Sequence, residues 1–191
     1  MMSREVPDKV SPAKTHDFFI KEKEDKIVMI DYNSNELKNI PVAELAKLTG
    51  EGHYAYQTTL GGRIFISGGE GSEGRLCEAV WMGKDSMRLE EMAKMITARN
   101  KHCMTLCDAG QYLMASGGDK KGGLFSNTYD VVTKECELYN ISKNTWKKMA
   151  PMNEARRYHA SVEVTEGIIY VFCGVDEDDK YLNSIERFTL T

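Results

Sequence analysis

Short apolar runs separated by polar turns recur along this chain. A first run rich in β-forming residues meets a turn at a glycine, and a second run follows it; the pairs read HYAYQTTL and RIFIS, HCMTLC and QYLMAS, and HASVEV and IIYVFC. Polar loops of different lengths then lead to a third run, which reads CEAVWM (77–82), CELYNI (136–141) or SIERFTL (184–190). Runs of this size bounded by turn residues predict antiparallel strands joined by hairpins.

The runs belong to an internal repeat. Three of the four histidines open the same phrase, at His53, His102 and His159. The period is about 50 residues, which is typical of β-propeller blades. Each phrase has one glycine at the hairpin turn, where a positive φ is needed, and another at the end of the next strand, where backbones approach closely. The turn glycines are Gly61, Gly110 and Gly167, and the strand-end glycines are Gly68, Gly117 and Gly174.

Residues beside the repeated positions extend the pattern. A small residue precedes the strand-end glycine in every copy: Ser67, Ser116 or Cys173. A second glycine follows it in two copies, Gly69 and Gly118, and Val175 takes that place in the last copy. Two copies also share a linker, Met-x-x-Met-x-x-x-Arg-x-x-His, made of Met92, Met95, Arg99 and His102, then Met149, Met152, Arg156 and His159. Trp146 lies three residues before the second linker, and Leu89 takes its place before the first.

Each unit therefore reads as four short antiparallel strands in series, which is the blade of a β-propeller. We expect an all-β protein with a flexible N-terminal arm (1–16) and a repeat region over 17–191. The repeat region divides into a partial unit (17–42), two full units (about 53–95 and 102–152) and a partial unit (159–191) whose fourth strand is missing.

The combination of Arg-x-x-His, two runs around a glycine, a Gly-Gly pair, the sequences CELY or IERF, and Trp before a Met-rich linker resembles the kelch repeat. The stretch APMNEARRYHASVEVTEGIIYVFCG carries the most specific likeness. Departures are Val175 for a glycine, Leu37 and Leu89 for Trp, and Gly50 for the Arg before His53. The resemblance implies a kelch-type β-propeller, a ring that usually closes with about six or seven blades.

About three and a half blades are present here, and unsealed blades expose apolar faces and strand edges. Three interpretations stay open. The chain is a piece of a longer polypeptide, or a short product completed by self-association or by another chain, or an unusually small ring.

Composition excludes several classes of partner. The net charge of -4 and the pI near 5.7 provide no basic surface, so we expect neither nucleic acid nor membrane as a partner. The N-terminus has no apolar segment of the kind that signals secretion, and five cysteines without such a signal fit a cytoplasmic protein with free thiols. Cys103 and Cys107 are not a metal site by this reading, because on a strand they face one side and His102 faces the other.

The repeated polar residues have structural interpretations. The histidines of neighbouring blades are too far apart to share a zinc ion, so each is predicted to bond a loop backbone. Arg99 and Arg156 are predicted to be ion pairs or loop clamps, with recognition of an acidic ligand as the alternative. The linker methionines are predicted to pack between blades. We expect no catalytic, cofactor-binding or metal-binding residues.

Recognition is expected in the loops, which differ between the units. The 119–134 loop mixes basic and aromatic residues, and the 176–181 loop is acidic; the latter reads as a solvated turn and lacks the spacing of a calcium loop. The predicted partner-binding residues are Lys120, Lys121, Phe125, Tyr129, Asp176, Asp178 and Tyr181.

The leading functional hypothesis is a protein-interaction module. Resemblance to kelch proteins implies scaffolding, cytoskeletal association or substrate capture for a cullin-type ubiquitin ligase, the last of which needs an adaptor domain. An alternative is an enzyme similar to galactose oxidase or a sialic-acid epimerase, although the chain contains none of the usual catalytic motifs. A third is a truncated paralogue without independent activity.

Overall fold

The computed structural model describes residues 16–21, 26–31, 36–41, 51–58, 63–70, 76–81, 87–122 and 129–190. Side chains are described for 63–69, 76, 78, 88–122 and 131–190. Gly61 and Phe125, and all of the predicted arm except His16, lie outside the described residues, whereas His16 opens the first strand. The side chains of His53 and Tyr129 are also outside this description.

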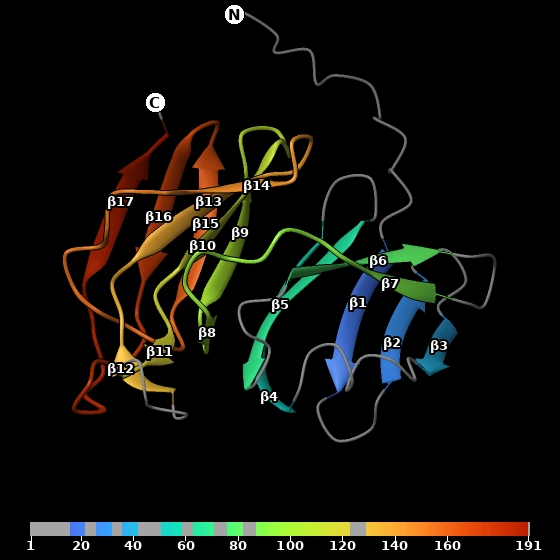
Figure 1. The fold of residues 1–191 in the computed structure, drawn as a ribbon, viewed down its shortest axis with the longest axis horizontal. Helices are drawn as coiled ribbons and strands as arrows, with labels where there is room; N and C mark the ends of the chain where they lie inside the picture. The colour runs from blue at the N-terminus through green and yellow to red at the C-terminus, as the bar shows by residue number, and fades with distance from the viewer. Residues whose placement is uncertain are drawn as a thin grey trace, which may run out of the picture.

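Two sheets form the N-terminal half of the molecule. Blade 1 is a meander of β1 (His16–Lys21), β2 (Lys26–Asp31) and β3 (Glu36–Pro41). Blade 2 follows with β4 (Glu51–Thr58), β5 (Ile64–Glu70), β6 (Leu76–Trp81) and β7 (Met87–Glu91), which pair in chain order. Figure 1 shows blade 1 beyond blade 2, at the end of the molecule away from the C-terminus.

Two further sheets form the C-terminal half. Blade 3 contains β9 (Cys103–Cys107), β10 (Tyr112–Ser116), β13 (Cys136–Asn140) and β14 (Thr145–Lys148). Blade 4 contains β15 (Ala160–Thr165), β16 (Ile168–Phe172) and β17 (Ile185–Thr189). All pairings are antiparallel and the described residues include no helix, which confirms the predicted all-β fold with four-stranded blades and a last blade of three strands.

The longest loop is more ordered than its sequence predicted. Its two ends form β11 (Asp119–Lys121) and β12 (Tyr129–Val132), and β11 also pairs with β8 (Arg99–Asn100) in the linker. The pairing of Asp119 with Asn100 and of Lys120 with Arg99 ties this loop to the linker before blade 3. The β11–β12 register shifts between Lys120 and Lys121, as it does at a β-bulge.

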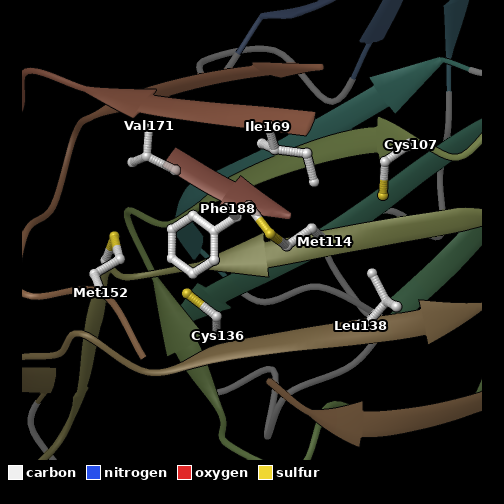
Figure 2. Packing of buried hydrophobic residues seen from close by; sticks show 8 residues of the cluster. All are labelled: Cys107, Met114, Cys136, Leu138, Met152, Ile169, Val171 and Phe188. Carbon is white, nitrogen blue, oxygen red and sulfur yellow. The ribbon is translucent and has the colours of Figure 1, made fainter. Parts of the chain in front are cut away.

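The core lies between the blades. Alternate residues of blade 3 point to opposite neighbours. Leu113, Ala115 and Tyr139 pack with Phe65 and Leu76 of blade 2. The opposite face packs against blade 4 in the cluster that Figure 2 shows, which consists of Cys107, Met114, Cys136, Leu138, Met152, Ile169, Val171 and Phe188.

The linker methionines complete these two clusters, as predicted. Met95 is buried with blade 2 and blade 3, and Met92 packs against the same cluster. Met152 and Met149 take the corresponding places between blades 3 and 4.

Blade 4 departs from the gap-free sequence alignment by one residue. In blade 3 Cys103 pairs with Ser116 across a hairpin that turns at Asp108–Gln111. In blade 4 the corresponding Ala160 pairs with Phe172, because a register shift between Glu163 and Thr165 precedes a shorter turn.

The strand ends are offset accordingly. Cys173, with a φ of 62°, matches Gly117 at 59°, and Gly174 at 92° matches Gly118 at 91°. The assignments of Cys173 to the small residue and of Val175 to the second glycine were therefore wrong. Phe172 and Cys173 take the places of Ser116 and Gly117.

Candidate functional site

Two of the repeated histidines, His102 and His159, form hydrogen bonds with the preceding blade. His102 Nε2 lies 2.8 Å from Ser67 Oγ of blade 2, and His159 Nε2 lies 2.8 Å from Ser116 Oγ of blade 3. Both imidazoles are buried. These contacts fit the predicted structural role, but the partner differs from the predicted one, because it is a serine hydroxyl and not a loop backbone group.

These histidines are held in the neutral form. Burial, helped by Arg99 and by His159, lowers the pKa of His102 well below its ordinary value. Burial, helped by Arg156 and Arg99, lowers the pKa of His159 to about 3. The Nδ1 atoms of both rings are buried without a hydrogen-bond partner. An imidazolium would leave a buried charge at the blade junction, so the neutral ring is the form that stabilises it.

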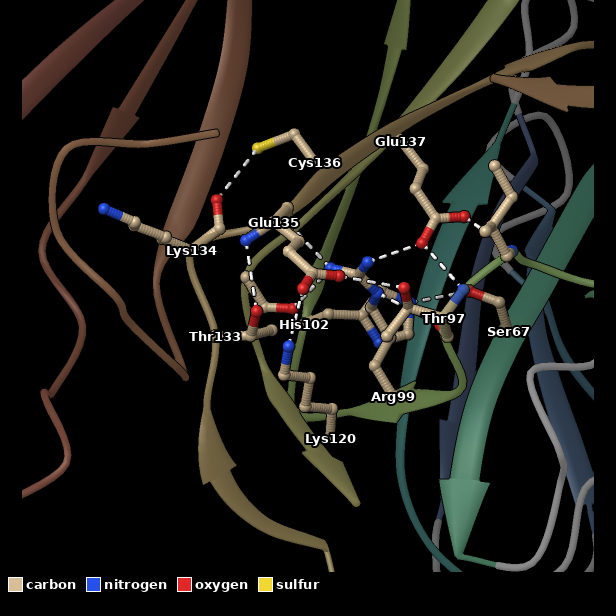
Figure 3. Close-up of polar contacts among 12 residues, drawn as sticks. Ser67, Thr97, Arg99, His102, Lys120, Thr133, Lys134, Glu135, Cys136 and Glu137 are labelled. Carbon is tan, nitrogen blue, oxygen red and sulfur yellow. Dashed lines mark hydrogen bonds and ion pairs between the residues drawn. The ribbon is translucent and has the colours of Figure 1, made fainter. Parts of the chain in front are cut away.

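The linker arginines clamp the blade that follows them. Arg99 is fully buried, and its Nη2 donates to Glu137 Oε1 at 2.6 Å while Nη1 donates to the carbonyl oxygens of Gly117 and Glu135 (Figure 3). Arg156 is also fully buried and donates to Glu186 Oε1 at 2.9 Å and to the carbonyl of Cys173 at 2.8 Å. This arrangement supports the loop-clamp interpretation. Neither guanidinium can reach an acidic ligand in solution.

The clamp glutamates also hold the linker backbone. Glu137 accepts the amide protons of Ile96 and Thr97 at 2.7 and 2.9 Å. Glu186 accepts those of Asn153 and Glu154 in the same manner. Burial opposes ionisation of Glu186, but these amides and Arg156 outweigh it and lower its pKa.

Trp146 connects blade 3 to the linker that precedes it. Its Nε1 donates to the carbonyl of Ala93 at 2.8 Å, and its ring lies 5.0 Å from that of Tyr139. Gly117 shows the close approach predicted for the strand-end glycine, since a Cβ there would lie 2.4 Å from the carbonyl oxygen of Arg156. The turn glycines Gly110 and Gly167 have the predicted positive φ, at 85° and 72°.

One ionic cluster joins the two loops that the sequence singled out. Asp119 is fully buried and accepts from Lys101 Nζ at 2.6 Å and from Arg157 Nη1 at 3.1 Å. Arg157 Nη2 also contacts Asp179 of the 176–181 loop. Burial opposes the charge of Arg157, but Asp179 and Asp119 outweigh it and raise its pKa. We call these four residues the Asp119 cluster.

Hydrogen bonds within the 176–181 loop also fix its conformation. Asp176 Oδ1 accepts the amide protons of Asp178 and Lys180, each at 2.9 Å. Asp178 pairs with Lys180 at the exposed surface. Asp176 therefore shapes the turn. This geometry fits the predicted solvated turn, with charges at its surface, better than it fits a calcium-binding loop.

Of the predicted partner-binding residues, those with described side chains lie at one end of blades 3 and 4: Lys120, Lys121, Asp176, Asp178 and Tyr181. Tyr181 is 92% exposed and Tyr158 is 54% exposed. Lys120 pairs with Glu135 at 2.5 Å and Lys121 is exposed. A hollow of about 680 Å³ lies beside the tyrosines, lined by Tyr158, Cys173, Gly174, Val175, Asp179, Tyr181 and Leu182.

Within the described residues, no three His, Cys, Asp or Glu side chains group as metal ligands. Cys103, Cys107 and Cys136 lie at least partly buried and Cys173 is exposed, and all four are free thiols. The strand geometry predicted for the first two is confirmed, since Cys107 faces blade 4 and Ser161 of blade 4 donates to Cys103 Sγ. No helix in the described part of the chain could span a bilayer.

Other proteins carry the sequence repeat that forms these blades. Residues 156–191 match the family model of the Kelch motif. Kelch-like protein 25 of Xenopus laevis is 30% identical over 152 residues, and those of Rattus norvegicus and Homo sapiens are 28% identical over the same length. The chain belongs to the kelch-repeat family.

These alignments cover 78% of this chain and 24% of each relative, so the chain spans about a quarter of the length of these curated kelch-like proteins. The solved structure of YjhT, a kelch β-propeller, matches with a TM-score of 0.67 at 13% identity. That match covers 89% of this chain and 53% of the YjhT chain, and it shows the fold. The His–Ser contacts therefore join successive kelch blades, and each arginine clamp fixes a linker to the blade that follows it.

Proposed function

We propose that this chain is a protein-interaction module that binds its partner at the end of blades 3 and 4 where the Asp119 cluster lies. The kelch repeats and the kelch-like relatives support an interaction role. The observation that carries the choice of surface is Tyr181, a nearly fully exposed aromatic on a loop that Asp176 and the Arg157–Asp179 contact hold in place. Exposed tyrosines on fixed loops are typical anchors of protein interfaces.

The charges around Tyr181 suit a partner surface that carries both signs. Asp178 and Lys180 are exposed beside it, and Lys120 and Lys121 lie on the neighbouring ribbon. Such rim charges orient a partner more than they increase affinity. Scaffolding and substrate capture are the two uses of this surface that we propose, and the partner's identity decides between them.

Crosslinking capture from cells tests the proposed surface. Tagged wild-type chain, Tyr181→Ala and Glu166→Ala are compared by quantitative mass spectrometry. Glu166 is an exposed residue of the β15–β16 turn, at the other end of blade 4, and serves as the control. We expect a protein that crosslinks to 176–181, is retained by the control and is lost with Tyr181→Ala. Equal retention by all three forms would reject this surface.

A further inference from the structure

The hollow beside Tyr181 is bounded by three short segments whose backbones are paired. Val175 bridges Arg157 on one side and Tyr181 on the other, in antiparallel fashion. Arg157 and Val175 exchange backbone hydrogen bonds of 3.0 and 2.9 Å, and the amide of Leu182 donates to the Gly174 carbonyl at 2.9 Å. These contacts fix the backbone around the hollow without a partner, and a preformed site loses little conformational entropy on binding.

Two tyrosines supply the aromatic part of the lining. Tyr158 and Tyr181 both line the hollow, and both are exposed. The Tyr158 backbone has a φ of 54°, and its amide donates to the Lys101 carbonyl at 3.0 Å. The Lys101 ammonium lies 5.6 Å from the centroid of the Tyr158 ring, as a cation does when it is attracted to a π-face. Lys101 is not among the described residues that line the hollow, so its ammonium does not fill it.

The surroundings of the hollow are acidic overall. The 176–181 loop holds four carboxylates and one ammonium group, and the Asp119 cluster adds one further carboxylate and two cations. Five carboxylates therefore stand against three cations. Asp179 is the one charged residue among the described residues of the lining, and its side chain is 77% exposed. The lysines of the neighbouring ribbon, Lys120 and Lys121, are not among those residues.

We propose that this hollow receives an arginine side chain of the partner. The proposal rests on the binding surface proposed above and names the chemistry that this surface recognises. A guanidinium is planar, so it stacks on tyrosine rings, and its fork of N–H groups donates to carboxylates. Its methylene stem suits the apolar part of the lining, which includes Cys173, Val175 and Leu182. Arginine and tyrosine are also the residue types that dominate the energetics of protein interfaces.

The same lining disfavours the other classes of side chain. A carboxylate of the partner would meet the excess negative charge of the loop. An apolar side chain without a charge would remove Asp179 partly from water and offer it no hydrogen-bond donor. An arginine satisfies both conditions, because its stem covers apolar surface and its charged end lies next to the loop.

Charged thiosulfonates that react with Cys173 measure this preference directly. Cys173 is an exposed free thiol of the lining, and the tryptic peptide 158–180 contains no other cysteine. The full chain is treated, at one ionic strength, with methanethiosulfonates that carry a trimethylammonium-ethyl group, its neutral tert-butyl analogue or a sulfonatoethyl group. Each rate is divided by the rate of the same reagent with 2-mercaptoethanol. We expect the cation to react about fivefold faster than the neutral analogue, and the anion to react more slowly than both.

Variants separate the aromatic contribution from the charge. Tyr181→Leu removes a ring at a highly exposed position and should reduce the advantage of the cation to about twofold, whereas Tyr181→Phe keeps the ring and should keep the advantage. Asp178→Asn removes an exposed carboxylate that pairs only with Lys180 among the printed ion pairs, and it should lower the ratio of cation to anion rates about twofold. Glu166→Gln makes the same kind of change at the other end of blade 4, where it should have no effect.

Protection by two small amides tests arginine itself. N-acetyl-arginine amide and N-acetyl-citrulline amide have similar shapes and differ in charge, and the neutral reagent reports the rate at Cys173. At about 10 mM, near the Kd expected for a single side chain, the arginine amide should slow this rate about twofold and the citrulline amide should not.

Three results would overturn the proposal: equal rates for the cation and its neutral analogue, an advantage that survives Tyr181→Leu, or equal protection by the two amides. Failure of the proposed function is distinguished from these results by the capture experiment. A cation preference without any protein captured at 176–181 would reject the protein-binding surface and leave the cation-binding hollow.

Discussion

We expect acidic pH to weaken the junction between blades 3 and 4, because His159 is then protonated in the unfolded chain. Replacing His159 by glutamine should remove this contribution to the pH dependence. A glutamine amide can donate to the Ser116 hydroxyl but does not titrate near neutral pH. Because the buried imidazole is held neutral with a pKa of about 3, its protonation is favoured in the unfolded chain, where a histidine has a pKa of about 6.5.

The sign and size of the effect follow from proton linkage. Stability from a histidine with a lowered pKa is fully present above pH 6.5 and is lost as the pH falls below that value, because the unfolded state then binds the proton. Between pH 7.5 and pH 5, His159 alone should reduce the free energy of unfolding by about 2 kcal/mol. His102 adds a loss in the same direction. Glu135 and Glu186, whose pKa values are lowered, contribute only below about pH 4.5.

Urea denaturation at pH 7.5, 6.5, 5.5 and 5.0, followed by tryptophan fluorescence, provides the measurement. His159→Gln should lose about 2 kcal/mol less than the wild type over this range. Ser116→Ala is the matched control: it removes the hydrogen-bond partner but leaves the histidine buried, so the pH dependence should remain. Equal pH dependence of the wild type and His159→Gln would refute the assignment of a buried neutral histidine.

Two further predictions concern the repeated glycines and the arginine clamp. Gly117→Ala should cost more than about 3 kcal/mol of stability, because its Cβ meets backbone, whereas Gly167→Ala, with its nearest neighbour at 3.4 Å, should cost about 1 kcal/mol; equal melting temperatures for the two variants would contradict this. Glu137→Gln should cost about 3–5 kcal/mol in urea denaturation, since it leaves the fully buried Arg99 without its counter-charge; a change below about 1 kcal/mol would show that the clamp carbonyls suffice.

Sequence reasoning succeeded where a residue type has one dominant structural use. The turn glycines needed a positive φ, and strand periodicity placed Cys103 and Cys107 on the side away from His102. It failed for the partner of His102 because that partner, Ser67, is distant along the chain and belongs to the previous blade. The recurrence of serine before the strand-end glycine was the signal that could have identified it.

The one-residue offset in blade 4 was hidden for a different reason. A gap-free alignment of the repeat sequences matched Gly117 with Gly174, but the length of a hairpin is set by its turn and by β-bulges. The register shift after Glu163 moves Cys173 into the place of Gly117, and only the pairing of Ala160 with Phe172 reveals it. The ribbon of β11 and β12 was equally hidden, because β8, its partner, contains only Arg99 and Asn100.

Contacts that recur from blade to blade serve stability, whereas a contact that occurs once can serve recognition. The His–Ser contacts and the arginine clamps recur at the two junctions whose side chains are described, between blades 2 and 3 and between blades 3 and 4, so they serve the fold and do not distinguish partners. The Asp119 cluster occurs once among the described residues: the linker before blade 3 has Asn100 where the next linker has Arg157, and the Asn100 amide is buried without a partner. A buried carboxylate with two cations contributes little net stability compared with apolar packing. Through the contact of Arg157 with Asp179, the cluster ties the 176–181 loop, which carries Tyr181, to the end of β11.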